Sequence, residues 1–259
     1  MEYQHLKWQV EGQVAIITFH RPEVFHSFNR SMALEMQHAL DMCKAEHIRA
    51  VLIQGEGKAF CAGQDLAEVT GPNPPSFQTI LSEHYNPIIE RICALPKPVI
   101  AAVNGVAAGA GANIALACDI VLASSQAAFI QAFSKIGLVP DSGGSYFLPR
   151  LVGYQKALGL MLTGDRVSAE EAERMGMIYR VLPAESFHAD GLAMAHQLSN
   201  MPTHALALTK QMMRQSMQSN LHEQLRLEEA MQIEAGQTAD YHEGVQAFMQ
   251  KRKPVFSGK

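Results

Sequence analysis

Short apolar runs mark the strands of this chain. Val14–Phe19 is almost entirely apolar and is followed by a turn at Arg21-Pro22, which is typical of a buried strand. Ala50–Ile53 and Pro98–Val103 are further runs of this kind. Continuous apolar runs rather than alternation predict strands that are covered on both faces.

Longer segments with helical spacing lie between the strands. Apolar residues recur at three- and four-residue intervals over Arg30–Ile48, and a second helix is expected over about Phe77–Leu95. This alternation of strands and helices predicts an α/β layered core. Val69–Phe77 is rich in Gly and Pro, so we expect a mobile surface loop or lid beside a site.

The character of the sequence changes at Ser168, where a capping box, Ser168-Ala-Glu-Glu171, begins a helix-rich stretch. After a short strand at Tyr179–Leu182, the chain to Lys259 is nearly all helical and rich in Met and Leu. We therefore divide the chain into a core, residues 1–195, and a C-terminal helical region, residues 196–259.

Composition and charge narrow the possible functions. The 259 residues are 47% hydrophobic and 18% charged, as in a compact globular protein. A formal charge of −4 argues against a nucleic-acid partner, which needs a basic face. No apolar run reaches the roughly 20 residues of a membrane span, and no secretory signal is visible. The four cysteines form no CxxC pair, so we expect free thiols and a cytoplasmic location.

Two segments put small residues where the backbone approaches a partner closely. Phe60–Asp65 (FCAGQD) follows a strand and a Gly-rich turn, and Val103–Gly111 (VNGVAAGAG) leads from a strand into a helix with few side chains. Unpaired N–H groups at a helix start suit an oxygen that becomes negative during a reaction. When either segment is taken alone, tight packing of a helix on a sheet is the better explanation.

Other interpretations of the small residues and histidines fail. Gly109-Ala-Gly111 lacks the third glycine and the acidic residue of a dinucleotide site, and the sequence has no GxxxxGK[ST] phosphate loop. Asp141–Gly144 superficially matches the nucleophile segment of trypsin-like proteases, but a suitable histidine context is missing. The sequence contains no HExxH and no paired metal spacing, so neither a metal nor a cofactor is expected.

Taken together, the segments resemble the crotonase (enoyl-CoA hydratase/isomerase) superfamily over nearly the whole chain. The motifs in order are AFCAGQDL, PKPVIAAVNGVAAGAG, FSKIGLVPDSGG and EGVQAFMQKRKPVF. Within it, HYNP, VNGVAAGAG and FSKIGLVPDSGG are most similar to the ring-1,2-epoxyphenylacetyl-CoA isomerases of bacterial phenylacetate degradation. The resemblance implies a right-handed spiral of ββα units, with C-terminal helices that assemble chains into trimers or dimers of trimers.

The resemblance also implies roles for particular residues. The backbone N–H groups of Gln64 and Ala110 would bind the thioester oxygen in an oxyanion hole, a term used here for this pair of donors. Such donors are typically worth about 3–4 kcal/mol each. Other positions match places that border coenzyme A: Ala62, Asp65, Leu66 and Ala67 in the same chain, and Phe248 and Lys251, which reach the CoA of a neighbouring subunit.

The catalytic carboxylates depart from the hydratase pattern. Hydratases carry two glutamates at positions that here hold Asn113 and Phe133, which are expected instead to line the substrate pocket. Hydration normally needs two carboxylates, so the acid that remains, Asp141, indicates isomerisation by one proton shuttle. A plain helix-capping role is the alternative for Asp141.

The leading functional hypothesis is therefore an acyl-CoA isomerase acting on an enoyl-CoA or a ring-epoxide phenylacetyl-CoA. A 2-enoyl-CoA hydratase of fatty-acid or aromatic-acid degradation is the alternative. An aryl-CoA dehalogenase with Asp141 as nucleophile is less favoured, because the tryptophan and histidine of such enzymes are replaced at about Phe133 and Asn86. A non-enzymatic RNA-binding or scaffold role is disfavoured by the charge of −4.

Overall fold

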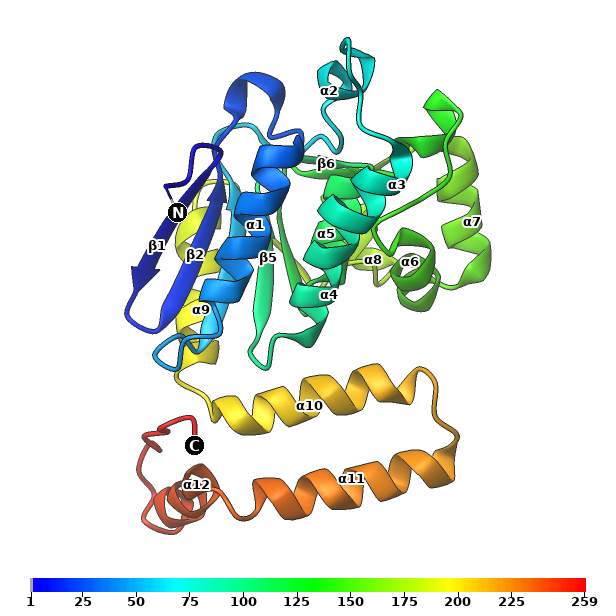
Figure 1. Ribbon diagram of the computed structural model, residues 1–259. Coiled ribbons are helices and arrows are strands. Elements are labelled where there is room, and N and C mark those ends of the chain that lie inside the picture. The colour runs from blue at the N-terminus through cyan, green and yellow to red at the C-terminus, as the bar shows by residue number, and fades with distance from the viewer. Residues whose placement is uncertain (1) are drawn as a thin grey trace.

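The computed structural model describes residues 2–259. Figure 1 shows a sheet covered by helices on both faces, with the last helices of the chain in a separate layer below it. The larger sheet has six strands in the order β1-β2-β3-β5-β7-β10. Their bounds are β1 Leu6–Glu11, β2 Val14–Phe19, β3 Ala50–Gly55, β5 Val99–Val103, β7 Ile120–Ser124 and β10 Arg180–Leu182. All neighbouring pairs are parallel except the β1–β2 hairpin.

A smaller sheet of four strands lies beside it, in the order β4-β6-β8-β9. Its strands are β4 Ala59–Cys61, β6 Val106–Ala108, β8 Ala128–Ile130 and β9 Arg166–Ser168. The chain enters the larger sheet (β3, β5, β7), passes into the smaller one (β4, β6, β8), and then forms a helical segment before returning. This repeat is the spiral of ββα units that the sequence predicts.

The helices cover both faces of the larger sheet. The helices of the core are α1 Arg30–Met42, α2 Leu66–Thr70, α3 Phe77–Thr79, α4 Asn86–Ala94, α5 Ala110–Ala117, α6 Gly144–Val152, α7 Tyr154–Thr163, α8 Ala169–Arg174 and α9 Phe187–Ser199. The lower layer, called the C-terminal layer below, contains α10 Thr203–Ser216, α11 Leu221–Ala235 and α12 Ala239–Met249.

Alternate residues of each central strand face two different hydrophobic clusters. In β2, Ala15 and Ile17 pack in the large cluster with α1, α4 and α5, whereas Val14 and Ile16 pack with α9. Because a strand alternates its side chains between faces, only an uninterrupted apolar run satisfies both clusters. The physical reason for the VAIITF sequence is therefore this double burial.

The predicted strands and helices are largely confirmed, with two differences in the helices. The helix that begins at Arg30 ends at Met42, not at Ile48. Residues 43–49 form turns that lead into β3, and Ile48 is buried there. The expected helix over 77–95 is helical over 77–94, but Ile80–Tyr85 forms a π-helical turn inside it. Such a turn holds an extra residue and often marks a functional site.

Strand β1 is absent from the sequence prediction. Only Leu6 of its six residues is fully buried, so the continuous apolar run that identifies the other strands is missing. Alternation of Leu6, Trp8 and Val10 before a glycine was the available signal, since Gly12 (φ 58°) turns the chain into β2.

Arg49 joins the C-terminal layer to the core. Its side chain is buried and donates to Thr203 Oγ1 (2.7 Å), to the Met201 carbonyl (2.6 Å) and to the Phe256 carbonyl (2.8 Å). The predicted division after residue 195 falls inside α9, which packs on the sheet, and the separate layer starts after that helix ends at Ser199. One buried cation therefore binds β3, the α9–α10 connection and the C-terminal tail together.

Candidate active site

Gln64 lies in a short extended segment after β4 that is held from one side by Phe28. The Phe28 N–H donates to the Gly63 carbonyl (2.7 Å), and the Asp65 N–H donates to the Phe28 carbonyl (2.9 Å). Successive peptide groups of an extended chain face opposite sides, so the Gln64 N–H points away from Phe28. Within residues 2–259 this N–H has no hydrogen-bond acceptor.

Ala110 is the first residue of α5, and its N–H is also free. The preceding residue, Gly109, adopts φ 53° and donates its own N–H to the Ile130 carbonyl (2.9 Å). The first intrahelical bond of α5 runs from the Asn113 N–H to the Gly109 carbonyl, which leaves the earlier N–H groups without intrahelical partners. The positive end of the helix dipole coincides with the Ala110 N–H.

Close packing of glycines brings these two N–H segments together. A Cβ on Gly63 would lie 2.9 Å from the Ala108 carbonyl oxygen and 3.5 Å from the Ala110 nitrogen. A Cβ on Gly111 would overlap the main chain of Cys61. Gly63 also has φ 94°, which an L side chain rarely adopts. The small residues that the sequence marks are thus required at the contact between the two segments.

Asp141 is held against the first turn of α5 by its own main chain. Its carbonyl oxygen accepts from the Gly144 N–H (2.8 Å) and from Asn113 Nδ2 (2.9 Å). Helix α6 has Gly143, not Asp141, as its N-cap residue, and its first turn receives no side-chain cap. Capping therefore does not explain Asp141, and its carboxylate is left for another role.

The environment of the Asp141 carboxyl favours its protonated form. Burial raises the pKa of Asp141, and a hydrogen bond from Ser142 Oγ to Oδ1 (2.8 Å) lowers it by a smaller amount. A carboxyl whose pKa is raised toward neutrality is a better general base than an exposed one. Oδ2 has no hydrogen-bond partner within the part of the chain that the structure describes.

Phe133 and Asn113 occupy the surroundings of this carboxylate in different ways. The Phe133 ring is 6% exposed and lies 3.8 Å from the position of a Cβ on Gly109, so it forms a wall beside Ala110. Asn113 is fully buried, and both ends of its amide are bound within the protein. The structure thus shows Phe133 next to the N–H pair, whereas Asn113 supports the Asp141 loop.

The structure adds Tyr85, to which the sequence assigned no role. This tyrosine, 1% exposed, comes from the π-helical turn and donates its hydroxyl to Gln64 Oε1 (3.0 Å), while Gln64 Nε2 donates to Glu68 Oε2 (2.8 Å). Burial raises the pKa of Tyr85 well above its usual value, with further contributions from Cys61 and Asp141. The available signal was the HYNP motif inside an otherwise regular helix.

The residues expected to border CoA form an open rim next to Gln64. Ala62, Leu66 and Ala67 are exposed. Asp65 caps α2 by accepting the Ala67 N–H (3.0 Å) and pairs with Arg21 (2.9 Å). This ion pair fixes the start of α2, so the rim is held next to Gln64.

Phe248 and Lys251 are not brought to this rim within one chain. Phe248 is 82% exposed on α12, and Lys251 follows it with φ 53°. In Figure 1, α12 lies in the C-terminal layer, on the opposite side of the core from α2. Any contact of these two residues with a ligand at Gln64 therefore requires a second chain.

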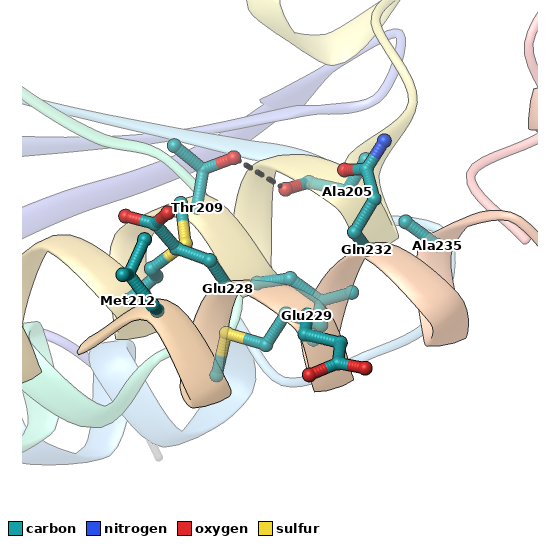
Figure 2. Close-up of a pocket in the computed structure, with 10 residues that line it drawn as sticks. Ala205, Thr209, Met212, Glu228, Glu229, Gln232 and Ala235 are labelled. Atoms are coloured by element: carbon teal, nitrogen blue, oxygen red, sulfur yellow. Dashed lines mark hydrogen bonds between the residues drawn. The ribbon is translucent and has the colours of Figure 1, made fainter. Parts of the chain in front are cut away.

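A cavity of about 520 Å³ between α10 and α11 is separate from these residues. Figure 2 shows its lining, in which Thr209 donates to the Ala205 carbonyl (2.8 Å) and Glu228 and Glu229 lie at the edge. None of the residues that the sequence assigns to the active site lines this cavity. It belongs to the helical layer rather than to the candidate active site.

The described residues offer neither a metal site nor a membrane-spanning helix. Residues 2–259 contain no group of three or more His, Cys, Asp and Glu side chains that could hold a metal ion. No helix among those residues is long and apolar enough to cross a membrane. Burial raises the pKa of Cys61 beside the N–H pair to about 12, so this thiol stays protonated and unreactive.

Comparison with known sequences gives a consistent result. A family model described as enoyl-CoA hydratase/isomerase matches residues 9–259. The chain is 44% identical to "Probable enoyl-CoA hydratase" of Rhodobacter capsulatus, covering 100% of both chains. It is 45% identical to "1,2-epoxyphenylacetyl-CoA isomerase" of Escherichia coli, covering 96% of this chain and 97% of that one.

Solved structures agree with the sequence comparison. The crystal structure of an enoyl-CoA hydratase from Bacillus anthracis superposes with a TM-score of 0.94 at 32% identity, covering 99% of this chain and 100% of that one. The predicted α/β fold, a crotonase-like spiral with a C-terminal helical region, is confirmed. The chain belongs to the enoyl-CoA hydratase/isomerase family and is an acyl-CoA enzyme of the crotonase superfamily.

Proposed function

We propose that this protein is a CoA-thioester isomerase with Asp141 as its single proton shuttle. The observation that carries this proposal is the half-buried carboxyl of Asp141, whose pKa is raised by burial; the main-chain carbonyl of the same residue accepts from Asn113 in the first turn of the helix that begins at Ala110. The two positions that would carry hydratase glutamates hold an amide, Asn113, and an aromatic ring, Phe133. One carboxylate is sufficient for isomerisation.

The reaction consists of two proton transfers through one enolate. The thioester carbonyl oxygen accepts from the N–H groups of Gln64 and Ala110. Asp141 removes a proton from a carbon next to the carbonyl, or conjugated with it, and the electron pair moves onto the thioester oxygen. The protonated Asp141 then returns the proton to a different carbon, so the product is an isomer of the substrate and no co-reactant is consumed.

The acyl group is proposed to be an unsaturated or ring-epoxide acyl chain. The relative named "1,2-epoxyphenylacetyl-CoA isomerase" matches nearly the full length of both chains. A second isomerase name, "Trans-2-decenoyl-[acyl-carrier-protein] isomerase" of Streptococcus mutans, occurs at 35% identity. An aromatic wall such as Phe133 suits either a planar ring or an extended alkenoyl chain.

Hydration of a 2-enoyl-CoA is the second candidate. A relative that carries a hydratase name is 44% identical to this chain, essentially the same value as for the isomerase name. A hydratase must orient a water molecule as well as transfer a proton, and a neutral Asn113 whose amide is already bound cannot act as a base. The aryl-CoA dehalogenase hypothesis remains weaker, because Phe133 and Asn86 stand at about the positions of the tryptophan and histidine of such enzymes.

Asp141→Asn tests the proposal directly. The amide retains the size of the side chain but cannot carry a transferable proton, so isomerisation should fall about 10²–10⁴-fold while acyl-CoA affinity stays nearly constant. Proton exchange next to the thioester in deuterated water, followed by NMR, measures the loss. Undiminished exchange in Asp141→Asn would refute the shuttle, and efficient addition of water to crotonyl-CoA by the unmodified protein would indicate a hydratase.

We also propose a homotrimer or a dimer of trimers. Large apolar side chains are exposed along the C-terminal layer, including Met213, Leu221, Ile233, Phe248 and Met249. Exposed apolar surface of this extent is typical of protein–protein contacts, and Phe248 needs a second chain to reach a ligand at Gln64. Light scattering should give three or six chains per particle, and a fully active monomer would refute the assembly.

A further inference from the structure

A chain of two side-chain amides leads from the core to the main chain of Asp141. Gln131 Nε2 donates to Asn113 Oδ1 (2.8 Å), and Asn113 Nδ2 donates to the Asp141 carbonyl oxygen (2.9 Å). Gln131 is 5% exposed and Asn113 is fully buried. These two linked amides therefore lie entirely inside the protein, and the last of them bonds to the residue that is proposed to carry the proton.

The direction of this chain is fixed by its last member. A carbonyl oxygen can only accept, so Asn113 must present its NH₂ group to Asp141 and its oxygen to Gln131. Gln131 must then present its own NH₂ group. Each amide thus has one allowed orientation, and Gln131 prevents the Asn113 amide from turning over.

Two features show that this pair of amides places demands on the fold. Gln131 Oε1 is buried and has no hydrogen-bond partner within residues 2–259, which lowers the stability of the fold. The Asn113 amide also requires a glycine at position 144, because a Cβ there would overlap it. An apolar side chain at position 131 would leave no unpaired oxygen, so the presence of a glutamine there calls for a functional reason.

The segment around Asp141 has few other supports. Ile136, Leu138 and Val139, which precede it, are exposed, and Ser142, which follows it, adopts a left-handed φ of 50°. The carbonyl of Asp141 is therefore held from within its own loop by Gly144 and from the core by Asn113. Without Asn113, the loop loses its side-chain bond to helix α5.

We propose that Asn113 and Gln131 are positioning residues, which act as one unit to hold the Asp141 carboxyl in register with the N–H groups of Gln64 and Ala110. This inference rests on the proposed function of Asp141. Neither amide touches the reacting atoms. Their effect is to fix the main chain from which the carboxyl projects, while Ser142 fixes Oδ1 and leaves Oδ2 for the proton.

The test compares Asn113→Leu, Gln131→Met and the double variant. A carboxyl displaced by about an ångström loses up to ~10²-fold in rate, so we expect kcat to fall about 10–100-fold in Asn113→Leu and about 3–10-fold in Gln131→Met. Affinity for a non-reactive acyl-CoA thioether, measured by calorimetry, should change less than about twofold. Because the two amides act as one unit, the double variant should be no slower than Asn113→Leu.

The pH profile distinguishes positioning from general destabilisation. Burial raises the pKa of Asp141, the Ser142 hydroxyl donates to its carboxylate, and the charge of Asp141 contributes to the raised pKa of the Tyr85 phenol. If Asn113→Leu lets the carboxyl move toward water, its pKa falls, and the acidic limb of kcat/KM moves to lower pH. Thr203→Val is the control, because it removes a buried hydrogen bond to Arg49 far from Asp141. It should lower Tm and leave both kcat and the pH profile unchanged.

Each outcome decides one of the two proposals. Additive losses in the double variant, unchanged kcat in both single variants, or an equal loss of kcat in Thr203→Val would overturn the positioning unit. Gln131→Met preserves the volume of the side chain, so it remains informative even if Asn113→Leu fails to fold. Failure of the proposed function is recognised separately, by isomerisation that persists in Asp141→Asn.

Discussion

The two halves of the candidate site are built in different ways. The N–H groups of Gln64 and Ala110 are placed largely by main-chain hydrogen bonds and by glycines packed against carbonyls. Asp141 is placed largely by side chains, namely the amide of Asn113 and the hydroxyl of Ser142. Side-chain substitutions should therefore change the acid–base half gradually, whereas the oxyanion half should depend on whether its glycines are present.

Among substitutions that leave the Asp141 carboxyl in place, the largest effect is expected for Gly63→Ala. The new Cβ meets the Ala108 carbonyl at 2.9 Å on a residue with φ 94°, so the two N–H segments must separate. Losing one donor of an oxyanion hole costs about 10²–10³-fold in kcat. Steady-state assays of acyl-CoA isomerisation measure this loss.

Gly159→Ala is the matched control for this glycine. Its position in α7 is exposed, and a Cβ there meets no atom within 4 Å. Replacing a helical glycine by alanine should raise stability by about 0.4–1 kcal/mol and leave activity unchanged. Equal activity in Gly63→Ala and Gly159→Ala would show that the two N–H segments are not an oxyanion hole.

A smaller effect is expected at Ser142. The hydroxyl lowers the pKa of Asp141, so its removal raises this pKa further, and the acidic limb of kcat/KM should move to higher pH. Asp141 must be ionised to accept a proton, so activity is lost as pH falls through its pKa. The plateau should change less than about tenfold.

Two variants separate the hydroxyl from backbone strain. Ser142→Ala keeps a side chain at φ 50°, whereas Ser142→Gly relieves that conformation. Both should shift the acidic limb equally, and only the glycine variant should gain stability in thermal unfolding. An unmoved limb in both would exclude the hydroxyl from the acid–base half of the site.

The smallest effect is expected for Gln64→Met. The substitution removes the bonds of the Gln64 side chain to Tyr85 and Glu68 but retains the backbone N–H. If the oxyanion half depends on the main chain alone, kcat should fall less than about tenfold. A loss as large as that of Gly63→Ala would mean that side chains place both halves.

The sequence predicted some parts of this molecule better than others for physical reasons. Strands buried on both faces, such as Val14–Phe19, have continuous apolar runs and were predicted with correct bounds. The half-exposed β1 and the three-residue strands of the smaller sheet have no such run. Pairing with neighbouring strands, rather than a continuous apolar run, forms these strands.

The same distinction holds in the site. Gln64, Ala110 and Asp141 follow from motifs that are local in sequence. Gln131 and Tyr85 do not, because a hydrogen bond between Gln131 and Asn113, or between Tyr85 and Gln64, joins residues about twenty positions apart. The π-helical turn, from which Tyr85 reaches Gln64, was not distinguished from a regular helix by the sequence pattern.

Arg49 gives the molecule one further property, which concerns cooperativity. If the C-terminal layer and tail detach, the Arg49 guanidinium loses two acceptors, Thr203 Oγ1 and the Phe256 carbonyl, and a buried cation that loses acceptors is costly. Asp240 holds the same tail through the N–H groups of Ser257 and Gly258. Local opening of the C-terminal layer thus exposes a charge at the base of the central sheet, and the two parts of the chain are expected to melt in a single calorimetric transition rather than as independent units.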